Sequence, residues 1–438
     1  MATADLTHGA LGRRLPGVHE AAAATALAGM VVTGFLLAAE VASAPSQFVR
    51  WSLEIGYPGW LRGPLDGLAE PITVKGFIGL TILLYGLYLV VVWTADAVRT
   101  SWALVAIGAL HLIFLLGPPM YLTDVFNYLG FARLDVLHGL SPYTHHPSAV
   151  PGDAVFPYVT WPDITSPYGP LFTLGSYLTA PLGIAGGVWA YKVSVAAASL
   201  GCVWLVWLLA RELGRPQVPA IVLVGLNPLL LVYGVGGAHN DVYMLALVLG
   251  GVLLAVRGRE ALGAGAIVAG AAVKATGGLA LPFLWLGARH RGAVVRGALI
   301  AAAAVVALTA VAFGSDVLRA LAPFGEQAST TNVRSFPGQI ADTFLGRDSV
   351  PAGIQAGAVV LFAVLAVLAF LHARRDGDWI GGIGWTMLAL LLTLTWVMPW
   401  YIAWLLPFAA LSTQTRLRAA TLACGAFLLI VHLPYPPN

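Results

Sequence analysis

The sequence is poor in charge. Asp, Glu, Lys and Arg make up 10% of its 438 residues, hydrophobic residues make up 59%, and the mean hydropathy is +0.83. Soluble domains carry about 25% charged residues, so this chain lacks the polar surface that a water-soluble domain needs. We therefore predict one membrane domain with lipid as its main solvent. The few basic residues are scattered instead of forming a tract, so no nucleic-acid partner is expected.

Cysteine and the common catalytic motifs are also scarce. Cys202 and Cys424 both lie within apolar runs, which is typical of small buried hydrophobic residues and not of a disulfide. The sequence has no glycine-rich phosphate loop and no metalloprotease helix motif. His145 and His146 are adjacent, but no third ligand follows at the spacing of a metal site. We therefore predict neither a metal nor another cofactor.

Long hydrophobic runs occupy most of the chain. A spanning helix needs about 20 apolar residues. Good candidates lie at 21–40, 73–93, 101–118, 188–210, 217–235, 240–256, 294–313, 354–372, 379–397 and 417–433. Weaker candidates lie at 168–186, 261–275, 277–288 and 398–412. Together they predict an all-α, polytopic transmembrane bundle of roughly 12–14 spans.

Arginines mark one side of this bundle, because short cytoplasmic loops are enriched in Lys and Arg. The set comprises Arg13, Arg14, Arg99, Arg211, Arg215, Arg257, Arg259, Arg289, Arg291, Arg296, Arg374, Arg375, Arg416 and Arg418. With these residues inside, the long loops at 41–72, 119–167 and 314–353 lie outside. The single domain then consists of N-terminal spans (1–118), an outer catalytic loop (119–167) and the remaining spans (168–438).

Two regions do not fit a simple succession of crossings. One of the segments 168–186 and 188–210 should not cross fully, because together they join an outer loop to an inner one. Segments 261–275 and 277–288 are short for two crossings at about 1.5 Å per residue. They predict a hairpin whose tip, near Lys274, ends within the membrane, where irregular backbone must pack in protein or line a cavity.

The first polar stretch that needs an explanation follows the third apolar run. Residues 124–138 predict an amphipathic helix on the outer surface, ended by Gly139 and Pro142. Its spacing places four residues on one face: Asp124, Tyr128, Phe131 and Asp135. A carboxylate at the boundary between water and lipid is a candidate general base. Asp124 is explained equally well as a helix N-cap, and the residues alone leave both interpretations open.

Further polar residues interrupt apolar segments. His239, Asn240 and Asp241 end the GGAHND turn, where they could grip a metal or sugar hydroxyls, or simply cap the next helix. Lys274 lies in the predicted hairpin, where a lysine costs about 2.5–3.5 kcal/mol unless it is paired or reaches water. We interpret it as a functional cation with a lipid phosphate as partner. Lys192 is expected to extend its ammonium group to the interface.

The outer loops supply the remaining candidates. Arg334 has a planar guanidinium that suits phosphate, although a solvated loop arginine is the commoner reason for such a residue. Aromatic residues accompanied by proline cluster at 158–168 and 396–404. Such rings usually form an interfacial belt, but here they could form walls for a sugar or an isoprenoid chain.

These stretches, in this order, resemble the GT-C superfamily of membrane glycosyltransferases. The likeness is greatest to the bacterial polyprenol-phosphate-mannose-dependent α-1,6-mannosyltransferases. Five stretches carry it: TDVFNYLGFARLDVLHGLSPY (123–143), WPDITSPYGPLF (161–172), LNPLLLVYGVGGAHND (226–241), the segment around Lys274, and MPWYIAWLLPFAAL (398–411). The chain departs from the family pattern at Asn127, where we expect a small hydroxyl residue, and at Ser141, where we expect Asp. The change at Asn127 is expected to alter contacts with the acceptor.

The resemblance implies a GT-C fold in the bacterial plasma membrane, with an inverting transfer on the outer face. The donor would be polyprenyl-phosphate mannose and the acceptor a glycolipid or cell-envelope glycan. The family's catalytic base matches Asp124, and Lys274 and Arg334 would stabilise the leaving phosphate. The implied substrate contacts are Tyr128, Arg133, Tyr168, His239, Asn240, Asp241, Lys274, Arg334, Trp400 and Tyr401.

Three alternatives remain open from the sequence, the last of which is a purely structural membrane subunit; Lys274 and the GGAHND turn argue mildly against that one. The same chemistry could use another polyprenyl-phosphate sugar, such as arabinose or glucose. The chain could instead transport or flip lipid-linked sugars. Transporters often contain internal repeats and broken helices at mid-membrane. No convincing repeat relates the two halves of this sequence, which favours the enzyme.

Overall fold

The computed structural model describes residues 16–43, 58–121, 124–321 and 331–434, in which the regular elements are helices and no extended strand forms. The predicted all-α polytopic architecture is confirmed. Six helices in the described ranges are long and apolar enough to cross a membrane: Gly17–Ser43, Val74–Trp93, Pro170–Glu212, Arg291–Leu321, Ala352–Asp376 and Thr415–His432. Shorter apolar helices lie between them at Thr100–Leu116, Asp241–Val256, Glu260–Val273, Ala275–Gly287, Trp379–Thr393 and Pro399–Leu411.

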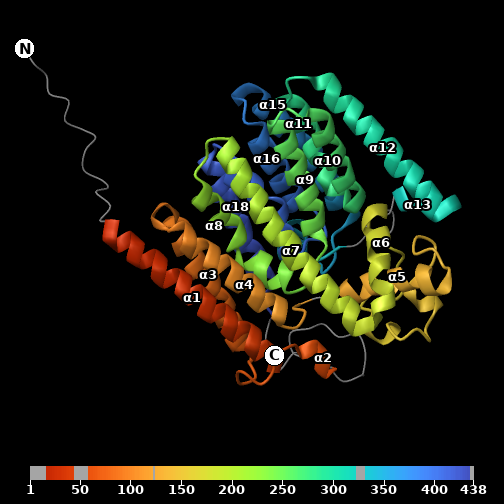
Figure 1. The fold of residues 1–438 in the computed structure, drawn as a ribbon, viewed down its shortest axis with the longest axis horizontal. Coiled ribbons are helices and arrows are strands. Elements are labelled where there is room, and N and C mark those ends of the chain that lie inside the picture. The colour runs from red at the N-terminus through yellow and green to blue at the C-terminus, as the bar shows by residue number, and fades with distance from the viewer. Residues whose placement is uncertain (1–15, 44–57, 122–123, 322–330, 435–438) are drawn as a thin grey trace, which may run out of the picture.

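The N-terminal helices form one edge of the molecule (Figure 1). Helix α1 (Pro16–Ser43) packs against both α3 (Val74–Trp93) and α4 (Thr100–Leu116). A four-residue helix, α2 (Gly59–Arg62), lies in the loop between α1 and α3. Helix α4 ends before Pro118 and Pro119, because proline has no backbone N–H to continue the helical hydrogen bonding.

The centre of the bundle contains α7 (Gly183–Glu212), α8 (Gln217–Gly225) and α9 (Asp241–Val256). Between α8 and α9 the chain forms a π-helical turn at Leu230–Val235. Helix α6 (Pro170–Ser176) is only seven residues long and continues into a 3₁₀ turn at Tyr177–Leu182. The segment 168–186 therefore does not form a crossing helix of its own. This agrees with the prediction that only one of the segments 168–186 and 188–210 crosses fully.

The predicted hairpin is present. Helix α10 (Glu260–Val273) ends at Lys274, a 3₁₀ turn follows at Ala275–Ala280, and α11 (Leu281–Gly287) returns. At 14 residues, α10 is about 21 Å long. A bilayer core is about 30 Å thick, so the tip at Lys274 stops short of a full crossing.

The C-terminal part begins at the right of the bundle in Figure 1 and ends against α3, where the hydroxyl of Tyr85 donates to the carbonyl of Leu422 at 2.8 Å. Helix α12 (Arg291–Phe313) leads into α13 (Val317–Leu321), and α14 (Phe336–Leu345) precedes α15 (Ala352–Asp376). After α16 (Trp379–Thr393), the predicted span 398–412 is divided into a 3₁₀ segment at Pro399–Trp404, here called η10, and α17 (Leu406–Leu411). The last helix is α18 (Thr415–His432).

The loop after α4 begins with α5 (Asp124–His138), which confirms the predicted helix and its end at Gly139. Most of residues 125–134 are buried, so α5 does not lie half-exposed on a surface. The following loop covers it through two side chains. Asp153 bonds Arg133, and Asn127 bonds the backbone at Trp161. The prediction of a helix lying on the outer surface is therefore wrong, because the folded loop packs over it. Hydrophobic periodicity along the sequence cannot show such a contact.

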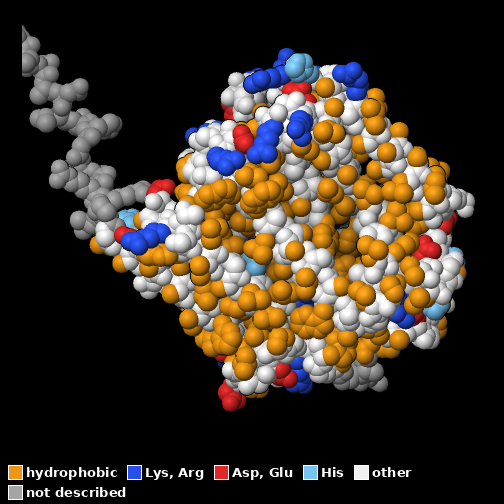
Figure 2. Space-filling model, viewed as in Figure 1, with side chains coloured by type: hydrophobic (Ala, Val, Ile, Leu, Met, Phe, Trp, Pro, Cys, Tyr) orange, Lys and Arg blue, Asp and Glu red, His pale blue; other side chains and the backbone are white. Residues whose placement is uncertain are grey.

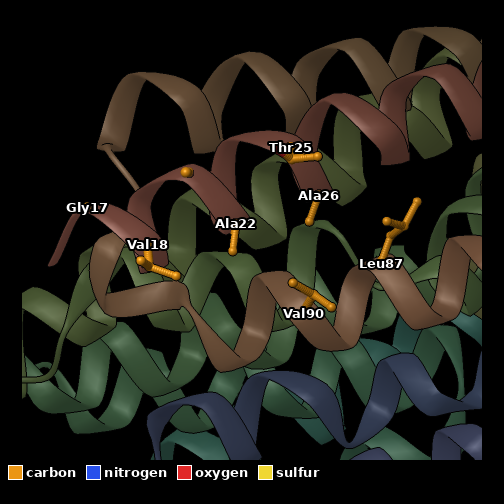
Figure 3. A pocket seen from close by; sticks show the side chains of 8 residues that line it. Gly17, Val18, Ala22, Thr25, Ala26, Leu87 and Val90 are labelled. Carbon is orange, nitrogen blue, oxygen red and sulfur yellow. The ribbon is translucent and has the colours of Figure 1, made fainter. Parts of the chain in front are cut away.

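The two ends of the bundle differ in charge. Several arginine-bearing turns lie close to one another. Arg418 is near Arg215 and Asp96, and the backbone of Arg289 and His290 donates to Glu260, which follows the turn at Arg257. We call this part of the molecule the arginine-rich end; ion pairs there join Arg99 to Glu20 and Arg257 to Glu212. Figure 2 shows a broad hydrophobic surface across the molecule, with many of the visible Lys and Arg side chains near its upper edge. An apolar groove of about 600 Å³ lies between α1 and α3 (Figure 3). It is lined by residues from the start of α1, such as Val18, and from α3, such as Val90.

Candidate functional site

Segments far apart in the sequence meet at the end of the bundle opposite the arginine-rich end. The start of α5, the GGAHND turn, the tip of the α10 hairpin and η10 all contribute side chains. His239 Nδ1 lies 3.5 Å from Asp124 Oδ2, and Lys274 Nζ lies 2.6 Å from Asp241 Oδ1. The backbone N–H of Asn240 donates to the hydroxyl of Tyr128 at 3.4 Å, which joins the two groups.

Asp124 is held as an accessible carboxylate. It is the first residue of α5, and its side chain is 15% exposed. The indole N–H of Trp161 lies 3.4 Å from Oδ1, while His239 lies beside Oδ2. The positive end of the helix dipole also favours a negative charge at this position. The side chain thus reaches toward other segments and keeps an exposed edge, which is the arrangement that a general base needs.

The GGAHND turn is a break in the helical chain. Asn240 makes no side-chain cap to α9, so the simple capping explanation does not hold for that residue. Ala238 has a φ of 56°, and Tyr121, shortly before Asp124, has a φ of 75°. Among the described residues these are the non-glycine positions with positive φ. Such strained backbone clusters at functional sites, and here it flanks the two segments that bring His239 and Asp124 together.

Glycine makes the turn possible. A Cβ atom on Gly237 would lie 2.4 Å from the carbonyl oxygen of Tyr233 and 2.7 Å from the ring of His239. The imidazole therefore packs closely against Gly237. It also stacks on Trp400, with ring centroids 3.4 Å apart and an interplanar angle of 9°. These two contacts hold the imidazole beside Asp124.

Asp241 and Lys274 form a buried ion pair. Their side chains are 3% and 17% exposed, and Trp404 donates its indole N–H to the same carboxylate oxygen at 2.6 Å. The ammonium group also lies 4.6 Å from the ring centre of Tyr401 and 5.1 Å from that of Trp404. The lysine that we assigned to a phosphate thus has a protein carboxylate as its partner. An ammonium group has three donors, so this pairing does not occupy all of them.

Of the seven buried side-chain polar atoms without a hydrogen-bond partner in the described part of the chain, four lie in this cluster. They are both ring nitrogens of His239, Nδ2 of Asn240 and Oδ2 of Asp241. Buried polar groups in native proteins are nearly always hydrogen-bonded. Donors and acceptors of this kind suit a ligand that carries several hydroxyl groups, as a sugar does.

Tyr168 is brought to the site by close backbone packing. The next residue, Gly169, donates its N–H to Val273 at 3.1 Å, and a Cβ there would lie 2.2 Å from the carbonyl oxygen of Ala272. This contact places the outer loop against the end of α10. The Tyr168 ring then packs edge-on against Tyr128, with centroids 5.0 Å apart.

Two of the predicted contacts lie apart from this cluster. Arg133 pairs with Asp153 at 2.8 Å, nine positions along α5 from Asp124, which is about 13 Å away. Its described contact is with the outer loop, which it holds against α5. Arg334 donates to the hydroxyl of Tyr121, on the segment that leads to Asp124. Arg334 therefore borders the site through Tyr121.

Comparison with known proteins decides the family. A profile described as "Alpha-(1->6)-mannopyranosyltransferase, N-terminal domain" matches residues 26–290, and one described as "MptB C-terminal domain" matches residues 338–436. The chain belongs to this mannosyltransferase family. The match begins in α1 and ends after the α10 hairpin, so it includes Asp124, the GGAHND turn and Lys274.

Individual relatives agree. The chain is 31% identical to alpha-(1->6)-mannopyranosyltransferase A of Mycobacterium tuberculosis, over 73% of this chain and 67% of that protein. It is 31% identical to the protein of the same name from Corynebacterium glutamicum, over 45% and 41%. It is 29% identical to a probable alpha-(1->6)-mannopyranosyltransferase of Mycolicibacterium smegmatis, over 70% and 65%. The matched part thus spans between 41% and 67% of the length of these relatives.

The structure gives Asn127 a role that the sequence did not reveal. Asn127 is buried, and its side chain bonds three backbone groups at Thr160 and Trp161. It therefore positions the loop that carries Trp161, and its described contacts are internal. The predicted change in acceptor contacts would have to act through that loop. The departure from the family pattern at Asn127 was the sequence signal that singled it out.

Lys192 was misread from the sequence. Its side chain does not reach the interface: it is 0% exposed, and its ammonium group donates to two backbone carbonyls. A lysine near the end of an apolar segment gives the same sequence pattern whether it reaches the interface or is buried. Only the packing of α7 among its neighbours distinguishes them.

Proposed function

We propose that this chain transfers a mannosyl group from polyprenyl-phosphate mannose to a hydroxyl of a glycolipid or cell-envelope glycan, with inversion, forming an α-1,6 linkage. The observation that carries the proposal is the position of Asp124, a partly exposed carboxylate beside a cluster of buried polar side chains. The names of the relatives, which specify α-(1→6) mannosyl transfer, support the sugar and the linkage.

Asp124 acts as the general base in this mechanism. It accepts the proton of the acceptor hydroxyl while that oxygen attacks the anomeric carbon of the donor. The bond between the anomeric carbon and the phosphate oxygen breaks, and polyprenyl phosphate leaves with the electron pair. Attack opposite to the leaving group converts a β-linked donor into an α-linked product.

Three kinds of group assist the reaction. Lys274 and Arg334 supply positive charge for the phosphate as it leaves. His239, Asn240 and Asp241 hold the sugar through the polar atoms that have no described protein partner. Aromatic rings such as Tyr401, which lies against Lys274, form a wall beside the donor.

The depth of the site fits a donor that arrives through the membrane. Helices α9 and α10 run from the arginine-rich end to Asp241 and Lys274 and are about 24 and 21 Å long. The site therefore lies below the far boundary of a core about 30 Å thick, where a polyprenyl phosphate can present its sugar. The arginine-rich end is cytoplasmic by the charge rule, so the site opens outward.

The test is transfer of labelled mannose from polyprenyl-phosphate mannose to membrane acceptors. We compare the wild type with Asp124→Asn and, as a matched control on the same helix, with Asp135→Asn. The described contact of Asp135 is with Tyr177. We expect transfer by the wild type and by Asp135→Asn, and a loss of at least about 100-fold in Asp124→Asn, the usual contribution of acid–base catalysis. Equal transfer by Asp124→Asn would remove this residue from the mechanism.

The donor is tested in the same assay. Polyprenyl-phosphate arabinose and polyprenyl-phosphate glucose replace the mannosyl donor. Transfer from one of these, with none from the mannosyl donor, would contradict the proposed sugar and keep the reaction class. Transfer from none of the three, by folded wild-type protein, would contradict the enzyme proposal in favour of transport.

A further inference from the structure

Lys192 has no role in the mechanism proposed above. It nevertheless bonds both the segment that leads to Asp124 and the GGAHND turn. It lies on α7, is 0% exposed and forms no ion pair with a carboxylate of the described residues. Its ammonium group instead donates to the carbonyl oxygen of Phe114 at 3.1 Å and to that of Gly236 at 2.9 Å. A buried lysine without a counter-ion is strongly unfavourable unless its donors are satisfied, so these two bonds hold it firmly.

The first acceptor is available because of proline. In a helix, the carbonyl of Phe114 would receive the N–H of the residue four positions later. That residue is Pro118, which has no N–H. The carbonyl at the end of α4 is therefore left for Lys192. The chain continues from this point to Tyr121, in its strained conformation, and then to Asp124.

The second acceptor lies at the break before α9. The helix before it ends in a cap at Ala238, where the N–H of Ala238 donates to Val235 at 3.2 Å and that of His239 donates to Gly234 at 3.0 Å. This cap leaves the N–H of Asn240 and the carbonyl of Gly236 without a helical partner. Asn240 donates to Tyr128 of α5, and the carbonyl of Gly236 accepts from Lys192 of α7. Two side chains thus satisfy backbone groups that the end of the helix leaves open.

We propose that Lys192 is a positioning residue, which holds the GGAHND turn in register with the segment that carries Asp124. One ammonium group bonds the carbonyls of both segments, and each segment includes a strained residue shortly after its bonded carbonyl: Tyr121 in one and Ala238 in the other. The result is the 3.5 Å approach of His239 to Asp124. The expected effect of Lys192 on the transfer rate rests on the proposed function. Its expected effect on the conformation of the turn rests on the geometry alone.

The test combines kinetics with local hydrogen exchange on the full-length protein. Lys192→Met keeps the length and removes the donors. Lys75→Met is the matched control, because Lys75 lies exposed at the start of α3. Displacing catalytic groups by about 1 Å can cost about 100-fold in rate. We expect kcat to fall by about 10- to 100-fold in Lys192→Met, and KM for the donor to rise as well, because the displaced turn also carries the residues proposed to hold the sugar.

Hydrogen exchange separates this proposal from the proposed function. In Lys192→Met, amides of 236–241 should exchange faster, while those within α10 keep their wild-type rates. This readout is informative even for a wild type that transfers no mannose. Unchanged exchange at 236–241, or wild-type kcat in a folded Lys192→Met, would overturn the proposal. If Lys192→Met does not fold, Lys192→Leu, which also lacks the donors, is measured under the same two criteria.

Discussion

At the scale of single residues, the site depends on charges that compensate one another within the bundle. Asp241 is 2% exposed and Lys274 lies beside it, so each is the counter-ion of the other. A charge left alone in such a place is far more unfavourable than the pair. This pairing explains how so apolar a chain can carry ionised groups in its interior.

The first prediction follows from that pairing. Lys274→Met leaves the carboxylate of Asp241 buried without its cation, and the stability should fall by about 3–5 kcal/mol. The double variant Asp241→Asn with Lys274→Met should recover much of that loss, because both charges are gone, but should not recover transfer. Thermal unfolding in detergent measures the first effect and the transfer assay the second. Equal stability of the single and double variants would show that the pair is not coupled.

A second prediction concerns Asp153, in the outer loop. Partial burial raises the pKa of Asp153, but hydrogen bonds from Arg133, from the N–H of Val155 and from His138 outweigh it and hold the pKa below its usual value. A carboxyl group whose pKa is lowered on folding stabilises the protein above its unfolded pKa of about 3.9. That stabilisation is lost as the pH falls through the folded pKa.

Asp153→Asn should therefore be less stable than the wild type at pH 7, and the difference should shrink below about pH 4. Melting temperatures of both proteins across this range provide the measurement. The exposed Asp163→Asn serves as the control and should show no such convergence. A constant difference between wild type and Asp153→Asn at every pH would mean that the ionised carboxylate is not what stabilises the loop.

At the scale of elements, broken helices make the site. The π-helical turn before GGAHND, the hairpin tip at Lys274 and the 3₁₀ segment η10 all interrupt apolar runs. Irregular backbone at such depth persists only where protein packs around it or where it lines a cavity. The close packing of Gly169 on α10 is one such contact, and it can be tested.

Gly169→Ala should disturb this packing, because the new Cβ would lie 2.2 Å from the carbonyl oxygen of Ala272. Overpacking of this kind costs about 1–3 kcal/mol, and the displaced loop should also lower transfer. Gly175→Ala, in α6, is the matched control, since its Cβ would meet nothing within 4 Å. Thermal unfolding and mannose transfer are measured for both variants. Equal stability and equal transfer would show that the contact of Gly169 with α10 does not position the loop.

At the scale of the whole molecule, orientation follows from the separation of the site from the arginine-rich end. If that end is cytoplasmic, the loop after α5 faces outward. Cys202 and Cys424 are buried, so they give little background in a labelling experiment. Asp163→Cys and Arg259→Cys both replace exposed residues, one in the outer loop and one in an arginine-bearing turn.

A membrane-impermeant maleimide should label Asp163→Cys in intact cells and should label Arg259→Cys only after the cells are lysed. Both variants should react fully in detergent, which controls for the accessibility of the thiol. The reverse pattern in intact cells would invert the orientation, and the proposed outward-facing site would be wrong.

The sequence by itself determined the membrane class, the positions of the long helices and the residues that needed a polar partner. Those properties depend on local hydrophobicity, on proline and on the cost of charge in lipid, all of which are read along the chain. Asp124 and the GGAHND turn were also found from the sequence, first as polar residues in apolar surroundings and then through the resemblance to a family.

Only the tertiary structure decided which residues meet. It paired Lys274 with Asp241, turned Arg133 toward Asp153, buried α5 beneath its loop and placed Lys192 between two backbone carbonyls. Each of these contacts joins segments that the sequence places far apart or in different helices. Hydrophobic periodicity sets the face that a helix presents, but the partner of a buried polar group depends on how the helices pack against one another.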